Sequence, residues 1–247
     1  MITKPMLILQ LRPEDTIADS EYACILKYGQ LVASATHRIR IEKQGIPEHL
    51  DIDHYAAIIV GGSPFDISTF ADRKSAIQKK IESDFIRLFD QVVPRDIPFL
   101  GCCSGNGLLG SYLGVDISTR YGEAVGCATI DLTEAGRQDK LLAGFPDRFD
   151  VLLGHKEACD VTPKGAVLLA TGSNCPVQMF RVGQNVYATQ FHPEGDAEEF
   201  VLRINAYKHH GYFEPHEAEK LKAAVSEKPT PYGQEILKRF VASYASC

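Results

Sequence analysis

The alternation of short apolar runs with helix-like segments is the feature that most constrains the fold of this chain. Apolar runs of strand length occupy residues 5–11, 56–62 and 97–101. Helical spacing is found at 19–29, which ends at Gly29, and at 75–93, where one face carries Ile77, Ile81, Phe85, Leu88 and Phe89. Continuous apolar strands separated by helices are typical of a parallel sheet covered on both faces. We therefore predict a flavodoxin-like, doubly wound α/β fold with a mostly parallel sheet and helices on both faces.

The pattern changes in the second half of the chain. Five strand-like runs follow one another at short spacing between about residues 124 and 191, and we expect a small antiparallel set that joins the main sheet. A helix at 196–211 has Asp196 as its N-cap and Gly211 as its stop, and two amphipathic helices follow it. We expect one core domain at 1–200 and a helical C-terminal extension at 201–247 that packs on the same domain.

Composition limits the classes of partner. The 247 residues carry 26 Lys and Arg against 32 Asp and Glu, so the formal charge of −6 argues against nucleic acid or an anionic membrane as the main partner. No segment approaches the roughly 20 apolar residues of a membrane span. The seven cysteines are odd in number and form no C-x-x-C pair, which suits reduced thiols. We expect a cytoplasmic protein whose ligands are small molecules or another protein.

The block "PFLGCCSGNG" places two adjacent cysteines at the end of an apolar run. Only Cys103 has glycines two residues away on both sides, Gly101 and Gly105, as a strained turn between a strand and a helix requires. The N-terminus of the following helix is expected to lower the pKa of the Cys103 thiol. Cys103 is thus the candidate nucleophile and Cys102 its core-packed neighbour. A glycine-rich turn with two buried thiols, or a strained disulfide between them, remain the alternatives.

A base for this thiol is suggested by "ATQFHPEGD". His192 directly follows a strand-like run, and Pro193 favours an extended conformation for it. Glu194, two residues further on, then points to the same side and can accept the imidazole N–H. This order predicts a Cys–His–carboxylate arrangement of Cys103, His192 and Glu194. The alternative is a His-Pro turn that merely closes a strand.

"GCCSGNG" followed by "QFHPE" resembles the class I glutamine amidotransferases, of the glutaminase type found in GMP synthase, over about residues 6–199. "AAIIVGGSP" resembles the family's strand and glycine turn that supplies an oxyanion-hole N–H. By that resemblance Gly62, or Gly61, donates one N–H and Ser104 the second.

The resemblance implies hydrolysis of a γ-carboxamide. Cys103 attacks the side-chain amide of glutamine, His192 carries the proton to the leaving ammonia, and water releases glutamate from a γ-glutamyl thioester. In related proteins the ammonia passes to a synthase domain or subunit. No stretch of this sequence reads as a synthase domain, so the resemblance implies either a separate synthase subunit or a stand-alone enzyme.

One position departs from the family pattern. The family usually carries a Gln two residues after the second elbow glycine, where it holds the substrate, but this chain has Gly107. Either Asn106 or another loop substitutes, or the substrate is a different γ-glutamyl amide or peptide. A catalytically idle regulatory subunit is the alternative from another class. A peptidase of the related intracellular-protease group is disfavoured, because that group lacks the late His-Pro-Glu.

The remaining motifs give weaker expectations. His155, in "GHKEACD", is expected near the substrate mouth, or else at a solvated strand end. We expect no metal and no cofactor, since no H-E-x-x-H, Cys/His cluster, P-loop or G-x-G-x-x-G loop occurs. The apolar faces of the tail helices are expected to pack on this chain's own sheet. Docking of a partner or of a twin subunit, giving a homodimer, is the alternative use.

Overall fold

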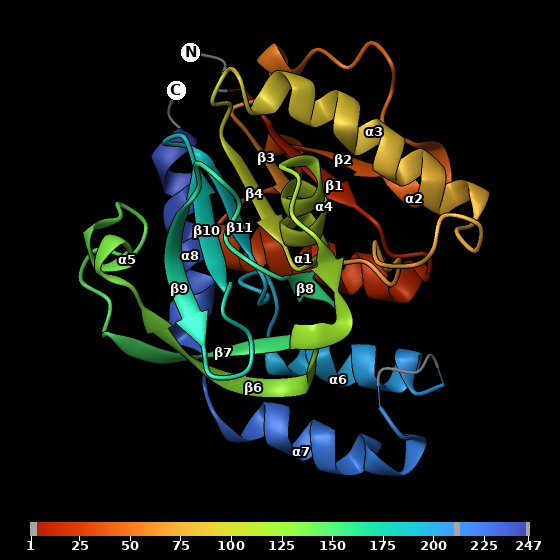
Figure 1. Cartoon of the computed structure of the whole chain (residues 1–247), viewed down its shortest axis with the longest axis vertical. Helices are drawn as coiled ribbons and strands as arrows, with labels where there is room; N and C mark the ends of the chain where they lie inside the picture. Colours follow the sequence, from red (N-terminus) through yellow and green to blue (C-terminus); the bar gives the residue numbers. More distant parts are fainter. Residues whose placement is uncertain (1–3, 210–212, 246–247) are drawn as a thin grey trace.

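A nine-stranded sheet runs through the molecule in this computed structural model, which describes residues 4–209 and 213–245 (Figure 1). In order across the sheet the strands are β2 (Thr36–Arg40), β1 (Met6–Gln10), β3 (Ala57–Val60), β4 (Phe99–Cys102), β11 (Val186–Thr189), β10 (Met179–Val182), β9 (Val167–Gly172), β6 (Glu123–Leu132) and β7 (Arg148–His155). A separate two-stranded sheet joins β5 (Ile117–Ser118) to β8 (Ala158–Cys159).

The first five strands of that order are parallel. β1 pairs with β2 and β3, β3 pairs with β4, and β4 pairs with β11, all in parallel register. β10, β9, β6 and β7 then continue the sheet in antiparallel pairs. The doubly wound α/β fold is confirmed, and so is the antiparallel set that joins the main sheet.

Helices cover both faces of the sheet. The helices are α1 (Asp15–Gly29), α2 (Ile41–Gln44), α3 (Ala76–Val92), α4 (Ser104–Tyr112), α5 (Glu134–Gln138), α6 (Ala197–Tyr207), α7 (Ala218–Glu227) and α8 (Pro231–Tyr244). Alternate residues of β1 enter different cores: Met6 and Ile8 face α1 and α8, whereas Leu7 and Leu9 face α3. This two-sided burial explains why the strands lack alternating polarity.

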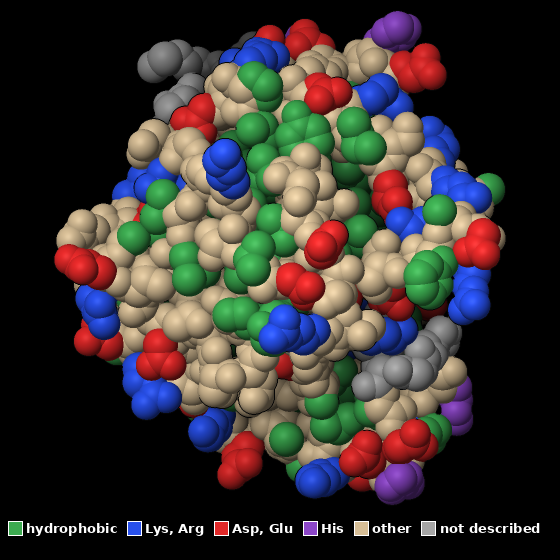
Figure 2. Space-filling view, viewed as in Figure 1, with side chains coloured by type: hydrophobic (Ala, Val, Ile, Leu, Met, Phe, Trp, Pro, Cys, Tyr) green, Lys and Arg blue, Asp and Glu red, His purple; other side chains and the backbone are tan. Residues whose placement is uncertain are grey.

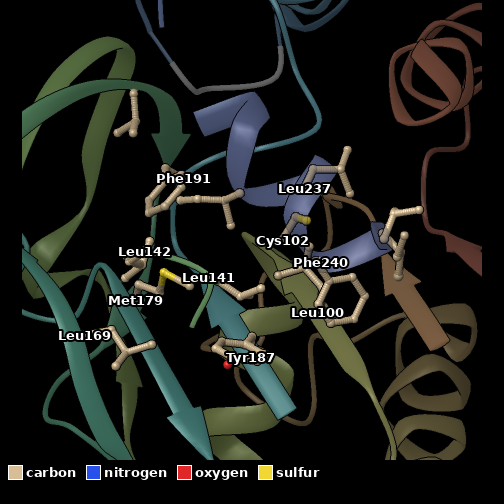
Figure 3. Close-up of a cluster of buried hydrophobic side chains, with 14 of the residues drawn as sticks. Leu100, Cys102, Leu141, Leu142, Leu169, Met179, Tyr187, Phe191, Leu237 and Phe240 are labelled. Atoms are coloured by element: carbon tan, nitrogen blue, oxygen red, sulfur yellow. The ribbon is translucent and has the colours of Figure 1, made fainter. Parts of the chain in front are cut away.

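The C-terminal helices belong to this same fold. Ile236, Leu237, Phe240, Val241 and Tyr244 of α8 are all buried against the sheet and α1, as their spacing predicted. Figure 3 shows Leu237 and Phe240 beside Leu100 and Cys102 of β4. α6 and α7 pack on each other and cover β6 and β7 through a smaller apolar cluster.

Local details correct three expectations. Ile77 is 50% exposed, so it does not belong to the buried face of α3. α1 begins at Asp15 rather than near Asp19, and the left-handed residue after it is Gln30, with φ of 53°, rather than Gly29. Asp196 does cap α6, since its carboxylate accepts the N–H of Glu199 at 2.9 Å. The expected stop at Gly211 lies outside the described residues.

The surface in Figure 2 carries acidic and basic side chains interspersed, rather than a stripe of one sign. No helix in residues 4–209 and 213–245 combines the length and apolarity needed to cross a bilayer.

Replacing Phe240 tests the contribution of α8. The ring is fully buried and lies edge-on to Tyr187, with centroids 6.4 Å apart. We expect Phe240→Ala to lower the free energy of unfolding by about 3–5 kcal/mol, measured by urea denaturation. Lys238→Ala, on the exposed side of the same helix, is the control and should change it by less than about 0.5 kcal/mol. Similar values for the two variants would contradict this role for α8.

Candidate functional site

The carboxyl ends of four adjacent parallel strands meet at one edge of the sheet. Arg12 follows β1, Gly62 follows β3, Cys103 follows β4 and His192 follows β11. These ends surround a cavity of about 710 Å³, including its open mouth. Its lining includes Arg12, Cys103, Ser104, Gln190, His192 and Arg203. Ligand sites of doubly wound proteins form at this edge, and the predicted Cys103, Ser104 and His192 lie together in the lining of this cavity.

Cys103 occupies a strained turn between β4 and α4. Its backbone has φ of 55° and ψ of −92°, a region that non-glycine residues rarely adopt. A Cβ on Gly101 would lie 2.8 Å from the backbone of Gly105, so glycine is required at the first position. A Cβ on Gly105 would make only ordinary contact with Val60, at 3.6 Å. The close approach is therefore set by Gly101.

The two cysteines point to different surroundings. Cys103 is partly buried and lines the cavity, and the Gln190 amide donates to its sulfur at 3.9 Å. Cys102 is fully buried in the apolar core, and the structure shows both thiols free. Burial, with the carboxyl of Glu194 nearby, raises the pKa of Cys102 well above its usual value.

Desolvation is the largest influence on the pKa of the Cys103 thiol in the resting site. Burial raises its pKa to about 12, with Arg12 opposing this rise and Glu194 adding to it. The expected lowering of this pKa by the N-terminus of α4 is therefore wrong for the resting site. At neutral pH the residue is a thiol.

His192 and Glu194 form a buried pair. Their Nδ1 and Oε1 atoms are 2.5 Å apart, which places the ring proton on Nδ1, facing the carboxylate. Burial lowers the pKa of His192 to about 4, although Glu194 acts in the opposite direction. Burial opposes ionisation of Glu194, but the charge of His192, their hydrogen bond and Arg203 outweigh it and lower its pKa to about 2. The edge of Phe200 also packs on the imidazole, with centroids 5.4 Å apart.

Arg203, from α6, lies against this pair. Its Nη1 is 2.9 Å from Nδ1 and 3.3 Å from Nε2 of His192, and its Nη2 is 3.3 Å from Glu194 Oε1. A guanidinium against the imidazole disfavours the imidazolium and adds to the low pKa of His192. Arg203 is therefore a positioning residue that also keeps the imidazole neutral.

Glu21, from α1, joins several of these groups. One carboxylate oxygen accepts from Arg12 Nε at 3.0 Å, from Arg203 Nη2 at 3.3 Å and from the Gly62 N–H at 3.2 Å. The other accepts from the Gln10 amide at 2.9 Å. The buried charge is thereby given a full set of donors, as an ion removed from water requires.

The predicted oxyanion donors differ in their surroundings. The Gly62 N–H donates to Glu21 in this structure, whereas the sequence led us to expect it to face the cavity. A Cβ on Gly62 would collide with Arg12 and lie 2.8 Å from His192 Cε1, so only glycine fits there. Ser104 begins α4 and lines the cavity, while its hydroxyl donates to Gly61 O at 3.0 Å.

The two weaker substrate-binding expectations have different outcomes. Asn106 lies on the buried side of α4, and its Oδ1 accepts from the Cys159 thiol at 3.1 Å. It faces Cys159 rather than the cavity, because its place on α4 turns it inward. His155 does line the cavity wall, but it is buried rather than at a solvated strand end. Its ring nitrogens face the Glu157 carbonyl at 2.9 Å and the Glu123 carboxylate at 3.1 Å.

Arg12, Glu21 and Arg203 were not foreseen from the sequence. A signal existed for Glu21, which shares the buried face of α1 with Ile17, Ala18, Cys24 and Ile25. Arg203 likewise shares the buried face of α6 with Phe200, Ile204 and Tyr207. A charged residue within an apolar helix face indicates a buried partner, although not which one.

The fold and cavity define a doubly wound α/β protein in which a thiol on a strand-to-helix turn and a histidine that follows the adjacent strand line the same cavity. Residues 23–206 match the family model for glutamine amidotransferase class-I, and the chain belongs to this family. A glutamine amidotransferase from Thermotoga maritima has the same fold, with a TM-score of 0.74, 20% identity and coverage of 96% of this chain and 98% of that one. A glutamine amido transferase from Methylobacillus flagellatus gives 0.71 at 14% identity, covering 98% and 96%.

Curated proteins similar in sequence to this chain include several GMP synthases. GMP synthase [glutamine-hydrolyzing] from Streptomyces avermitilis is 25% identical over 174 residues, which are 68% of this chain but only 30% of that protein. The chain thus spans about a third of the length of these relatives. A single subunit of the GMP synthase [glutamine-hydrolyzing] from Saccharolobus solfataricus is 24% identical over 172 residues, covering 68% of this chain and 84% of that polypeptide.

Glu199 gives the site a pH-dependent stability. Its Oε1 accepts from Arg203, and its other oxygen lies buried without a hydrogen-bond partner among the described residues. Burial, with Glu21 and Glu194 adding to it against both arginines, raises the pKa of Glu199 to about 7. Because the folded state holds this proton more tightly than the unfolded state, the stability it contributes is lost as pH rises through about 7.

We expect Glu199→Gln, which mimics the protonated acid, to match the parent near about pH 5 and to exceed its free energy of unfolding by roughly 1–3 kcal/mol near about pH 8.5. Urea denaturation at the two pH values measures the difference. Glu198→Gln, at the exposed neighbouring position, is the control and should leave the parent's pH dependence unchanged. An equal change at both pH values for Glu199→Gln would show that its carboxyl does not titrate in this range.

Proposed function

We propose that this protein hydrolyses the side-chain amide of glutamine to glutamate and ammonia, with Cys103 as nucleophile, His192 as base and acid, and Glu194 as the group that orients His192. The observation that carries the proposal is the strained Cys103 turn opening into the same cavity as the hydrogen-bonded His192–Glu194 pair. Membership of the class I glutamine amidotransferases supports the reaction type.

The acylation step starts from two neutral groups. Because Nδ1–H of His192 faces Glu194, the lone pair on Nε2 can take the Cys103 proton as sulfur attacks the amide carbon. The imidazolium then passes this proton to the amide nitrogen, the C–N bond breaks, and ammonia leaves behind a γ-glutamyl thioester. Charge develops only during attack, when the buried Glu194 carboxylate stabilises the imidazolium.

Hydrolysis of the thioester repeats these roles with water. His192 removes a proton from water, the oxygen attacks the thioester carbon, and the C–S bond breaks. The proton returns to sulfur, which restores the Cys103 thiol and releases glutamate. This sequence needs no group beyond substrate and water.

For the oxyanion we propose the main-chain N–H groups of Ser104 and Gly62. Ser104 follows Cys103 at the start of α4, where helix N–H groups lack helical acceptors. The Gly62 N–H is held by Glu21 in the resting site, so it becomes available only if the oxyanion replaces that carboxylate. The Arg12 guanidinium, which also lines the cavity, places a positive charge close to the reacting carbonyl.

We propose that the ammonia is used by a separate synthase subunit. The match to most of one polypeptide of the Saccharolobus solfataricus GMP synthase supports this arrangement, as does the match to only about a third of the longer GMP synthases.

A second candidate, hydrolysis of another γ-glutamyl amide, is favoured by the environment of Gly107. Gly107 lines the cavity, and a Cβ there would lie 2.8 Å from Ile67 Cδ1. Glu157 holds this part of the loop, accepting the Ile67 and Ser68 N–H groups at 2.7 Å each. The space that a Gln at 107 would fill is thus occupied by Ile67, which points to a changed substrate pocket.

Ammonia or amine release tests both candidates. The parent is incubated with glutamine and a panel of γ-glutamyl amides, and Cys103→Ala is expected to reduce release at least about 1,000-fold because no nucleophile remains. Cys127→Ser, a partly buried thiol on β6 outside the cavity lining, is the matched control and should retain activity. Release from other γ-glutamyl amides but not glutamine would select the second candidate. If Cys103→Ala still releases ammonia or amine at the parent's rate, both candidate functions are contradicted.

The pH profile tests the protonation states. Since the pKa of His192 is lowered to about 4, kcat/KM should fall on the acid side with an apparent pKa well below 6.5. Since the pKa of Cys103 is raised to about 12, the profile should stay level well above neutrality. Circular dichroism at each pH confirms that the protein is folded. An acid limb at or above 6.5 would contradict a neutral buried base.

A further inference from the structure

A buried cluster of three potential metal ligands lies beside the cavity. Glu123 begins β6, His155 ends β7, and Cys175 lies between β9 and β10. Their donor atoms, a carboxylate oxygen, an imidazole nitrogen and a thiol sulfur, all lie within 4.8 Å of one another. The side chains of His155 and Glu123 are 2% and 6% exposed, and Cys175 is fully buried. Three segments thus bring three kinds of donor to one point.

The hydrogen bonds of His155 place a ring nitrogen without a proton opposite the Glu123 carboxylate, with no positive charge between the two atoms. Its Nδ1 is 2.9 Å from the Glu157 carbonyl, which only accepts, so the ring proton sits on Nδ1. Its Nε2 is 3.1 Å from a Glu123 carboxylate oxygen, which in its ionised form also only accepts. A neutral imidazole therefore turns a lone pair toward a carboxylate. The contact becomes favourable with a second proton or with a cation between the two atoms.

The surrounding groups orient these donors as metal sites require. A metal-binding histidine usually donates its second ring N–H to a carbonyl or carboxylate, as Nδ1 does here to Glu157 O. The Gln178 amide donates to the Glu123 oxygen at 2.6 Å and so fixes the carboxylate. Gln178 is completely buried, yet its own Oε1 has no hydrogen-bond partner among the described residues. An unpaired oxygen of this kind, beside the cluster, suits a site that holds a cation or its water.

We propose that Glu123, His155 and Cys175 bind a divalent cation of the zinc class. Thiolate, imidazole and carboxylate are the ligands that Zn²⁺ takes, and three protein ligands leave a fourth position for water or another ligand. One thiolate, one carboxylate and a neutral imidazole balance the double charge of the ion, so the complex is neutral in its buried setting. The cation would deprotonate Cys175, which burial otherwise keeps as a thiol by raising its pKa to about 12.

The donors are near their bonded positions. Tetrahedral coordination at ordinary Zn–N, Zn–O and Zn–S distances puts donor atoms about 3.3–3.6 Å apart. The nitrogen–oxygen separation of 3.1 Å is already close to this, and the distances from the sulfur, at most 4.8 Å, need to shorten by no more than about 1.5 Å. A bound ion would link β6, β7 and the segment before β10 at the wall that His155 contributes to the cavity.

Cobalt binding tests the site without any measurement of activity. The full chain, treated with a chelator and kept reduced, is titrated with Co²⁺, whose bond to a thiolate gives a charge-transfer absorption. We expect one strongly bound Co²⁺ per chain, with that absorption, displaced by Zn²⁺. Cys175→Ser should abolish the absorption, and Glu123→Gln should weaken binding at least about 10-fold. Zn²⁺ should also raise the Tm of the parent but not of Cys175→Ser.

Two matched thiol variants locate the bound ion. Cys127→Ser and Cys103→Ala should both keep the absorption, because neither thiol belongs to the cluster. Loss of the absorption in Cys103→Ala instead would place the metal at the nucleophile and overturn the proposal. Failure of the parent to bind Co²⁺ or Zn²⁺ would overturn it as well. If Cys175→Ser does not fold, the parent's stoichiometry and Glu123→Gln still decide the question.

Discussion

The hydrogen bonds of the buried Glu21 carboxylate are the interaction on which the organisation of the site depends. Arg12, Arg203 and the Gly62 N–H all donate to this one side chain of α1. They come from the end of β1, from α6 and from the end of β3, which are segments far apart along the chain. Burying a carboxylate costs several kcal/mol unless its donors are complete. The cavity edge is thus fixed by the need to satisfy a charge as well as by apolar packing.

The same charges set the protonation state around His192. Three carboxylates, Glu21, Glu194 and Glu199, face two guanidiniums, Arg12 and Arg203, among the described residues at this edge. The carboxylates outnumber the guanidiniums by one, and Glu199 has a hydrogen-bond donor on only one of its oxygens. The pKa of Glu199 is therefore raised to about 7, so this carboxyl keeps its proton below that pH. Arg203 and burial meanwhile keep His192 neutral. The resting thiol and imidazole are both uncharged, and this is the state from which the proposed hydrolysis starts.

Most of the secondary structure was predictable because it depends on neighbouring residues. Apolar runs marked the parallel strands β1, β3 and β4, and helical spacing in the tail marked the buried face of α8. The parallel strand β2 has the sequence THRIR, which contains no apolar run, and it was not predicted. The wrong predictions concern residues near the ends of helices, where helical spacing alone does not show which side chains are buried or which residue ends the helix. Ile77 has the right spacing but is half exposed near the start of α3, and Gln30 adopts the left-handed conformation expected of a glycine.

The sequence alone determined the features that local geometry controls. The turn at Cys103 follows from a glycine two residues before it, and the His192–Glu194 pair from a spacing of two residues that a short turn through Pro193 brings together. Only the tertiary structure decided which charges meet, since Glu21 and Arg203 are 182 residues apart. It also decided that the Cys103 thiol is protonated, because burial outweighs the helix N-terminus that the sequence reveals. Desolvation and long-range charge pairing depend on how distant segments are packed, and no local pattern of residues encodes that packing.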